Sequence, residues 1–365
     1  MFSYKKWWLM PFLFAASLVF LTSCGDGGES KAPGEEQPSP QAQAAVWPGD
    51  DWEVSTPEGE GMDATRLEDV GSYCEAHKCG AVVVTRHGRI VWERYWGGWD
   101  ENSTDNSWSM AKSMTDALVG IAISEGKIKD VDESAADFIP EWRGTRKEEI
   151  TIRHLLSMDS GLLWNEDYYE MEGSDVITMI TSHDQTAYAI DRPPFHDPAD
   201  DWYYSSGDTQ LFSAIIRAAT GMEAGQYAEE KLFGPIGMKG AMWDSDNAGH
   251  TVTFCCVYTT ARNFARFGYL FLRNGRWNDK QVVPEDWVEE SIKPSQSENP
   301  GYGYFWWLLH FPDVPQDMYY ADGFQTKRIY VIPSLDIGAV RIGQGDDAWD
   351  DNAFLKPIVE AVIDK

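Results

Sequence analysis

The chain has 365 residues and a formal net charge of −29, because 59 acidic residues outnumber 30 basic ones. Its residues are 43% hydrophobic and 13% aromatic, enough to fill a sizeable core, so wholesale disorder is excluded. The charge also argues against nucleic-acid binding and against electrostatic adhesion to anionic lipids, because both need a clustered basic surface. The length fits one large domain or two intertwined lobes.

The first 23 residues are typical of an export signal. Lys5 and Lys6 precede an apolar run over residues 7–20, which is too short to span a membrane comfortably. The run ends in Leu-Thr-Ser-Cys and resembles a bacterial lipoprotein signal, with Cys24 as the acylated first residue of the mature protein. An ordinary secretory signal with an incidental Cys is the alternative. We expect an exported lipoprotein that faces the periplasm or the cell surface, anchored in a membrane through Cys24.

A tether and one folded domain are expected to follow the signal. Residues 24–46 are rich in Pro, Gly and polar side chains and show no periodicity, which is typical of a semi-extended linker. The folded domain is predicted over residues 47–365.

Four further cysteines lie in this domain, at positions 74, 79, 255 and 256. An exported protein meets conditions that permit disulfides, and four cysteines allow three full pairings. We favour a Cys74–Cys79 bond, which would close a small loop beside a predicted strand. Four reduced, buried thiols are the alternative, and the spacing does not indicate a zinc site.

The predicted elements place strands near both ends of the domain and helices between them. Residues 81–95 form two β-rich runs around Gly88, which predicts a hairpin. Apolar residues then recur at helical spacing in several segments. Helices are predicted over residues 110–126, from near 151, over 209–220 and over 260–272. Two β-branched runs at residues 328–332 and 337–342 and a final helix over 353–363 close the chain. The pattern predicts a sheet built from both ends, with a helical lobe inserted.

The pattern with catalytic potential is Ser109-Met110-Ala111-Lys112, at the start of the first of these helices. Residues at i and i+3 share a helix face, so Ser109 and Lys112 are expected to be neighbours. The positive end of a helix dipole favours a developing alkoxide. A Lys on an apolar face has a lowered pKa and can accept the serine proton. In isolation the pattern also fits an N-cap Ser and a solvated Lys.

Several segments together resemble the serine β-lactamase-related family, which includes class C β-lactamases, D-amino-acid peptidases, related esterases and 6-aminohexanoate-dimer hydrolases. The stretch from Trp108 to Thr115 resembles that family's nucleophile helix. Matching segments lie at residues 108–115, 118–122, 125–128, 155–162, 232–238 and 260–268.

The resemblance covers roughly Met62 to Lys365 and implies an α/β (α+β) fold of the β-lactamase/transpeptidase type. In this fold helices flank an antiparallel sheet, and an all-helical lobe is inserted, here over roughly residues 127–245. The cleft between sheet and lobe would hold the active site.

The family's second catalytic element is Tyr-x-Asn, and the matching residues are Tyr204-Ser205-Ser206. The resemblance implies that the phenol of Tyr204 helps to deprotonate Ser109 and then protonates the leaving group. Ser206 replaces the Asn; it keeps a donor and an acceptor for the substrate but has a shorter reach. The alternative is a packed Tyr in the aromatic run with Trp202 and Tyr203.

The third element, Lys-Thr-Gly, is matched by Ala321-Asp322-Gly323, so the Lys and Thr that grip a substrate carboxylate are absent. The resemblance implies that these three residues line the substrate site. It also implies an oxyanion hole formed by the backbone N–H groups of Ser109 and Phe324. A plain strand-edge glycine is the alternative for Gly323.

A narrower resemblance concerns residues 164–168, which look like the Asp-Glu-Asp-Tyr segment of 6-aminohexanoate-dimer hydrolases. It implies that Tyr168 contacts an amide substrate, whereas a surface-loop aromatic is the alternative. The Tyr-x-Ser form of the second element also suits this branch better than the β-lactamases.

These features predict a serine hydrolase that forms an acyl-enzyme at Ser109 and needs no metal or organic cofactor. The missing carboxylate grip favours an ester or amide of a small or linear substrate over a β-lactam or a D-amino-acid peptide, which remain the alternatives. A different class also stays open, namely a catalytically inactive surface lipoprotein that uses its cleft to bind a ligand.

Overall fold

The computed structural model describes residues 45–170, 172–296 and 298–363. The predicted export signal, Cys24 and nearly all of the predicted tether lie outside these residues. Near the start of the described chain, the carbonyl of Val46 accepts a hydrogen bond from the Tyr269 hydroxyl at 2.6 Å. The Trp47 ring packs against Tyr269 and Trp277. The chain is therefore held against the fold from its first described residues.

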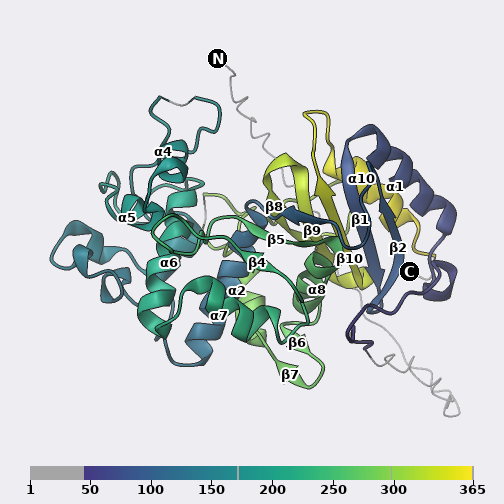
Figure 1. Cartoon of the computed structure of the whole chain (residues 1–365), viewed down its shortest axis with the longest axis horizontal. Helices are drawn as coiled ribbons and strands as arrows, with labels where there is room; N and C mark the ends of the chain where they lie inside the picture. The colour runs from purple at the N-terminus through teal and green to yellow at the C-terminus, as the bar shows by residue number, and fades with distance from the viewer. Residues whose placement is uncertain (1–44, 171, 297, 364–365) are drawn as a thin grey trace, which may run out of the picture. The chain divides into compact units, whose positions relative to one another are not determined.

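The described strands form three sheets. Their bounds are β1 (Cys79–Arg86), β2 (Arg89–Tyr95), β3 (Thr104–Asn106), β4 (Met242–Trp243), β5 (Val257–Thr260), β6 (Arg276–Trp277), β7 (Lys280–Gln281), β8 (Tyr319–Gly323), β9 (Lys327–Ile332) and β10 (Ile337–Gly343). The main sheet is antiparallel with the order β2-β1-β10-β9-β8, so strands from both ends of the chain lie side by side (Figure 1). The predicted hairpin and the two predicted C-terminal strands are confirmed.

Helices cover both faces of this sheet. The α-helices are α1 (Ala64–Ala76), α2 (Met110–Ser124), α3 (Ile152–Ser157), α4 (Asp175–Thr181), α5 (Gln185–Ile190), α6 (Ser206–Thr220), α7 (Ala224–Ala228), α8 (Ala261–Leu272), α9 (Glu285–Ser291) and α10 (Asp351–Glu360). Helices α1 and α10 pack on one face of the sheet and α8 on the other (Figure 1). Alternation along β1 explains the two layers, because Val82 faces the α1–α10 core and Val83 the α2–α8 core.

The helical lobe contains α3 to α7 and joins the sheet through α2 and α6. Its longest helix, α6, begins at Ser206 rather than near residue 209 as predicted. The side chain of Ser205 accepts a hydrogen bond from the Asp208 N–H at 2.9 Å and so caps the helix three residues earlier. The fold is the predicted one, an antiparallel sheet with flanking helices and an inserted lobe.

The predicted Cys74–Cys79 disulfide is wrong. Both residues are free, buried thiols between α1 and the sheet, and Cys255 and Cys256 instead form a disulfide between adjacent residues. The Cys74 and Cys79 thiols hydrogen-bond to each other, and burial raises the pKa of Cys74. A bond between these two residues would close a short loop, which removes little entropy from the unfolded chain and gives their pairing little advantage.

Within the described ranges, no helix combines the length and the apolar character that crossing a membrane requires.

Candidate active site

Helix α2 carries the predicted nucleophile into the centre of the domain. Every residue from Met110 to Ala122 is buried, so the helix is enclosed on all sides rather than amphipathic. Ser109 stands at its N-cap but makes no capping bond with its side chain. Trp108, just before it, has a left-handed backbone with φ 46°. Ser107 fixes this turn through two hydrogen bonds with Val257 on β5, at 2.8 and 3.0 Å. The turn therefore presents the Ser109 hydroxyl instead of using it as a cap.

Lys112 lies one turn further along and is buried, with 1% of its surface exposed. Its ammonium is 3.1 Å from each of three oxygens: the hydroxyls of Ser109 and Ser206 and the carbonyl of Phe254. Burial lowers the pKa of Lys112 to about 8, and the charges of Glu166 and Asp322 partly oppose that effect. An ammonium has three N–H donors and all three have acceptors here. Losing one proton leaves a lone pair next to Ser109.

Tyr204 lies against both of these groups. Its phenol faces the Ser109 side chain, which slightly opposes the effect of burial on the pKa of Tyr204, and its ring lies 5.0 Å from the Lys112 nitrogen. The ring stacks on Trp307 with centroids 6.0 Å apart, and the edge of Tyr302 packs beside it. Burial raises the pKa of Tyr204 well above its ordinary value, so the phenol keeps its proton at neutral pH. It is placed to donate that proton to a leaving group at Ser109.

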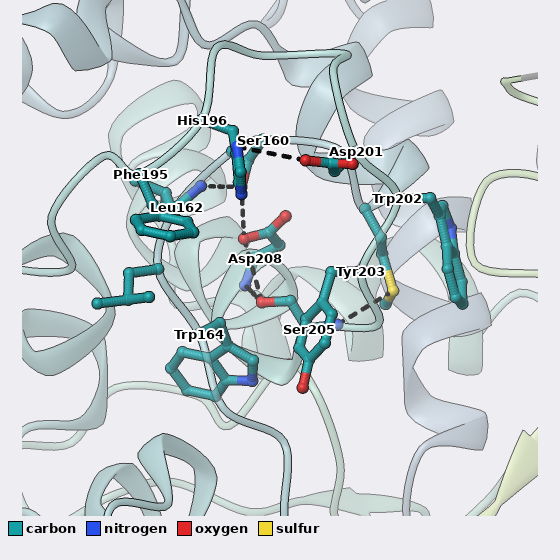
Figure 2. Close-up of a pocket in the computed structure, with 13 residues that line it drawn as sticks. Ser160, Leu162, Trp164, Phe195, His196, Asp201, Trp202, Tyr203, Ser205 and Asp208 are labelled. Atoms are coloured by element: carbon teal, nitrogen blue, oxygen red, sulfur yellow. Dashed lines mark hydrogen bonds and ion pairs between the residues drawn. The ribbon is translucent and has the colours of Figure 1, made fainter. Parts of the chain in front are cut away.

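The segment that carries Tyr204 lines two cavities. Tyr204 lines a cleft of ≈ 450 Å³ that also contains Ser109. Its neighbours Tyr203 and Ser205 line a second cavity of ≈ 320 Å³ (Figure 2). There the buried Asp208 accepts hydrogen bonds from Ser160 at 2.9 Å and Ser205 at 3.1 Å. Through Asp208, these bonds connect the Tyr204 segment to Ser160, which follows α3 in the helical lobe.

Ser206 links Lys112 to a carboxylate that the sequence did not indicate. Its hydroxyl donates to Glu166 Oε1 at 2.5 Å, and its N–H donates to Glu166 Oε2 at 2.8 Å. The Tyr168 hydroxyl also donates to Glu166 and lies 3.5 Å from the Ser206 oxygen. The Tyr168 ring stacks on Phe324 across the cleft, with centroids 5.8 Å apart. The structure therefore brings Tyr168 and Ser206 together beside Lys112.

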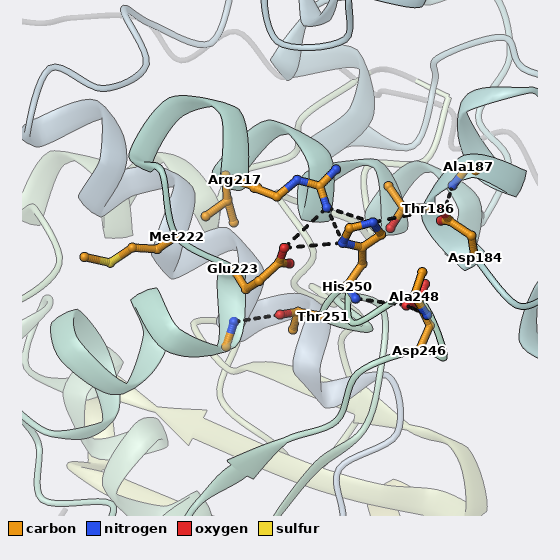
Figure 3. A network of polar contacts seen from close by, with 12 residues as sticks. Asp184, Thr186, Ala187, Arg217, Met222, Glu223, Asp246, Ala248, His250 and Thr251 are labelled. Carbon is orange, nitrogen blue, oxygen red and sulfur yellow. Dashed lines mark hydrogen bonds and ion pairs between the residues drawn. The ribbon is translucent and has the colours of Figure 1, made fainter.

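The Phe254 carbonyl reaches Lys112 because the segment before it is anchored along its length. His250 lies in a polar network with Arg217 and Glu223 and donates its backbone N–H to Asp246 at 2.9 Å (Figure 3). Further along this segment, the Gln210 side chain donates to the Thr251 carbonyl and accepts from the Thr253 N–H. The Thr115 hydroxyl on α2 donates to the Thr253 carbonyl. The Cys255–Cys256 disulfide follows directly.

Two backbone N–H groups point to an oxyanion hole. Within the described part of the chain, neither the Ser109 N–H nor the Phe324 N–H has a protein acceptor, and both residues line the cleft. Gly323 lets the backbone next to Phe324 come close to the start of α2. A Cβ at position 323 would lie 2.4 Å from the Ser107 carbonyl oxygen and 3.2 Å from Met110. The two donors are available for an oxygen that becomes negative at a carbonyl attacked by Ser109.

The three residues at the Lys-Thr-Gly position do not all face the cleft. Ala321 is completely buried in the core, so the structure does not bring it to the substrate site. Asp322 does line the cleft, and it pairs with the Arg328 guanidinium, which also contacts Asp351 at 3.0 Å. Burial raises the pKa of Asp322 to about 6. The position at which the family pattern has a Thr next to a basic residue therefore holds Asp322, an acid that is paired with Arg328.

Among the predicted site residues, the structure places Ser109, Tyr168, Tyr204, Asp322, Gly323 and Phe324 along one cleft. Lys112 and Ser206 lie directly behind them. Sequence reasoning missed Glu166 and the Phe254 carbonyl. The signal for Glu166 was present, since it is an acid two residues before Tyr168, whereas a backbone carbonyl has no signature in the sequence. Where the structure describes the chain, no group of three or more His, Cys, Asp or Glu side chains is placed to hold a metal ion.

Comparisons with known proteins agree with this geometry. A 6-aminohexanoate-dimer hydrolase from Paenarthrobacter ureafaciens is 26% identical over 251 residues, which cover 64% of this chain and 62% of that enzyme. A D-aminopeptidase from Brucella anthropi is 24% identical over 181 residues, covering 46% of this chain and 33% of the enzyme. The matches thus span less than two thirds of these enzymes.

Solved structures show the same fold. A Bacillus anthracis protein provisionally named a 6-aminohexanoate-dimer hydrolase superposes with a TM-score of 0.70 at 22% identity, covering 86% of each chain. A family VIII carboxylesterase gives a TM-score of 0.67 at 16% identity, covering 85% of this chain and 98% of that one. Residues 71–358 match the Beta-lactamase family, so the chain belongs to the β-lactamase family of serine hydrolases.

Proposed function

We propose that the protein hydrolyses an ester or amide of a small or linear substrate through an acyl-enzyme at Ser109. The observation that supports this most directly is the 3.1 Å contact between the Ser109 hydroxyl and the buried nitrogen of Lys112. A neutral Lys112 accepts the Ser109 proton as the serine oxygen bonds to the substrate carbonyl carbon. The N–H groups of Ser109 and Phe324 stabilise the resulting oxyanion.

Collapse of this intermediate breaks the bond to the leaving group, which takes a proton from the phenol of Tyr204. Lys112 then returns its proton to the phenolate, so both groups regain their starting states. In the second half of the reaction a water takes the place of the leaving group. Attack of the water on the acyl carbon releases the acid and restores the Ser109 hydroxyl.

The lining of the cleft supports this substrate class. The pairing of Asp322 with Arg328 leaves no free cation at the position where relatives hold a substrate carboxylate. Aromatic rings of Tyr168, Trp307 and Phe324 line the same cleft and suit an apolar acyl chain. Relatives named as a 6-aminohexanoate-dimer hydrolase and a carboxylesterase support an amide or ester substrate.

Turnover of a p-nitrophenyl ester, the 6-aminohexanoate dimer and nitrocefin by one preparation tests this proposal. We expect the ester or the linear amide to be the better substrate, and preference for nitrocefin would overturn the substrate assignment. A fluorophosphonate probe should label the wild-type protein but not Ser109→Ala. Absence of labelling in folded wild-type protein would instead favour a binding module without catalysis.

We also propose that the protein is an exported lipoprotein held at a membrane through Cys24. The apolar run and the Leu-Thr-Ser-Cys sequence that ends it support this location. Mass spectrometry of the N-terminal peptide from the native host should find a diacylglyceryl-modified Cys24. A secreted form cleaved elsewhere would refute the anchor.

A further inference from the structure

Glu166 is connected to Lys112 through the Ser206 hydroxyl, which contacts both groups. Its Oε1 accepts from the Ser206 hydroxyl at 2.5 Å and from the Tyr168 phenol. Its Oε2 accepts from the Ser206 N–H at 2.8 Å and from the Trp164 indole. Trp164 is itself buried, with 7% of its surface exposed. The carboxylate is therefore fixed by donors on three residues.

These contacts leave the Glu166 carboxylate with little capacity to bind a substrate. Each oxygen already accepts two hydrogen bonds, which uses most of the capacity of a carboxylate. Two of its donors are Ser206, which contacts Lys112, and Tyr168, which lines the cleft. Since the Ser206 hydroxyl donates its proton to Glu166, its lone pairs face Lys112, which lies 3.1 Å away.

We propose that Glu166 is a positioning residue, which fixes Ser206 beside Lys112 and balances the charge that the lysine acquires when it accepts the nucleophile's proton. In relatives with Tyr-x-Asn, one amide side chain occupies the position of Ser206. Here a shorter hydroxyl and a carboxylate behind it take that place together. This inference rests on the proposed acyl-enzyme mechanism.

Among the described residues, Glu166 and, to a smaller extent, Asp322 raise the pKa of Lys112 through their charges. Asp322 is paired with Arg328 and is unchanged in a Glu166 variant, so such a variant isolates the effect of Glu166. On its other sides Lys112 faces the ring of Tyr204 and the carbonyl of Phe254. No proton moves to Glu166 in the reaction, because Lys112 takes the Ser109 proton and later returns it through Tyr204.

The test is the pH dependence of kcat/KM for a p-nitrophenyl ester in Glu166→Gln and in the wild type. Removing the negative charge that Ser206 connects to Lys112 should move the acidic limb of the profile to lower pH by about 1 unit. Looser placement of Ser206 should also lower the plateau by about tenfold. Glu170→Gln, an exposed acid on the same loop, is the matched control and should change neither quantity.

A second variant separates the effect of the Glu166 charge from the effect of its side-chain length. It also keeps the test valid if Glu166→Gln does not fold. Glu166→Asp keeps the charge but shortens the side chain, so the limb should stay in place while the plateau falls. An acidic limb that does not move in folded Glu166→Gln, or a wild-type plateau in Glu166→Asp, would overturn the proposal. Ser109→Ala is measured beside them, because activity in that variant would refute the acyl-enzyme mechanism itself.

Discussion

The burial of Lys112 predicts a specific pH dependence of the chemical step. Only the neutral amine can accept the Ser109 proton, and the pKa of Lys112 is about 8 instead of 10.5. At pH 7 about one molecule in ten is then in the active form. We expect kcat/KM for a p-nitrophenyl ester to rise about tenfold per pH unit below pH 8 and to level off above it. Lys112→Met should lose about 10² to 10⁴ in kcat.

The same variant gives an independent measure of this pKa through stability. Between pH 8 and 10.5 the unfolded lysine binds a proton and the folded one does not, so wild-type stability rises with pH in that window. Relative to Lys112→Met, the wild-type free energy of unfolding should increase by about 2 kcal/mol between pH 7 and pH 10. Urea denaturation at both pH values measures this difference. A constant difference, together with a flat rate profile, would refute a buried lysine as the base.

Three further predictions concern packing, specificity and the disulfide. Gly120→Ala should cost about 1 to 3 kcal/mol in urea denaturation, because its Cβ would lie 2.3 Å from the Trp287 ring; unchanged stability would contradict this packing. Asp322→Asn should remove one of the two carboxylates paired with Arg328 and lower KM for nitrocefin, a carboxylate, by about fivefold relative to a neutral ester. An equal change in KM for nitrocefin and for the neutral ester would argue against binding of the carboxylate by Arg328. Reducing the disulfide should lower kcat severalfold with KM unchanged, because it holds the neighbouring carbonyl that contacts the buried ammonium; Cys256→Ser is the reductant-insensitive control.

The sequence indicated those parts of the site that depend on local spacing or on a motif. Ser109 and Lys112 are three residues apart on one helix, so their contact follows from helix geometry alone. Tyr204 and Phe324 could be placed only through the family resemblance, because long stretches of chain separate them from Ser109. The hairpin and the C-terminal strands were readable because β-branched runs flank clear turns.

Other parts depend on tertiary detail that no pattern encodes. Ala321 and Asp322 are adjacent, yet the alternation of side chains along β8 sends one into the core and the other into the cleft. Without the exact strand register, their facing cannot be assigned. Glu166 contacts Ser206 across 40 residues of sequence, and the Phe254 carbonyl belongs to the backbone. The disulfide between adjacent cysteines required a left-handed Cys256, with φ 76°.

The strand order of the main sheet has a consequence for how the protein becomes active. Strand β10 lies between β1 and β9, so the last strand of this sheet in the sequence is inserted at its middle. Val83 pairs with Val340, a contact that closes a loop of more than two hundred residues. Helices α3 to α7 precede β10 in the sequence, so they are made before this closure, and closing so long a loop is a slow kind of folding step. Chains that stop before residue 337 therefore contain Ser109, Lys112 and Phe324 but lack β10, the strand that joins β1 to β9. We therefore expect a chain truncated before residue 337 to show no ester hydrolysis.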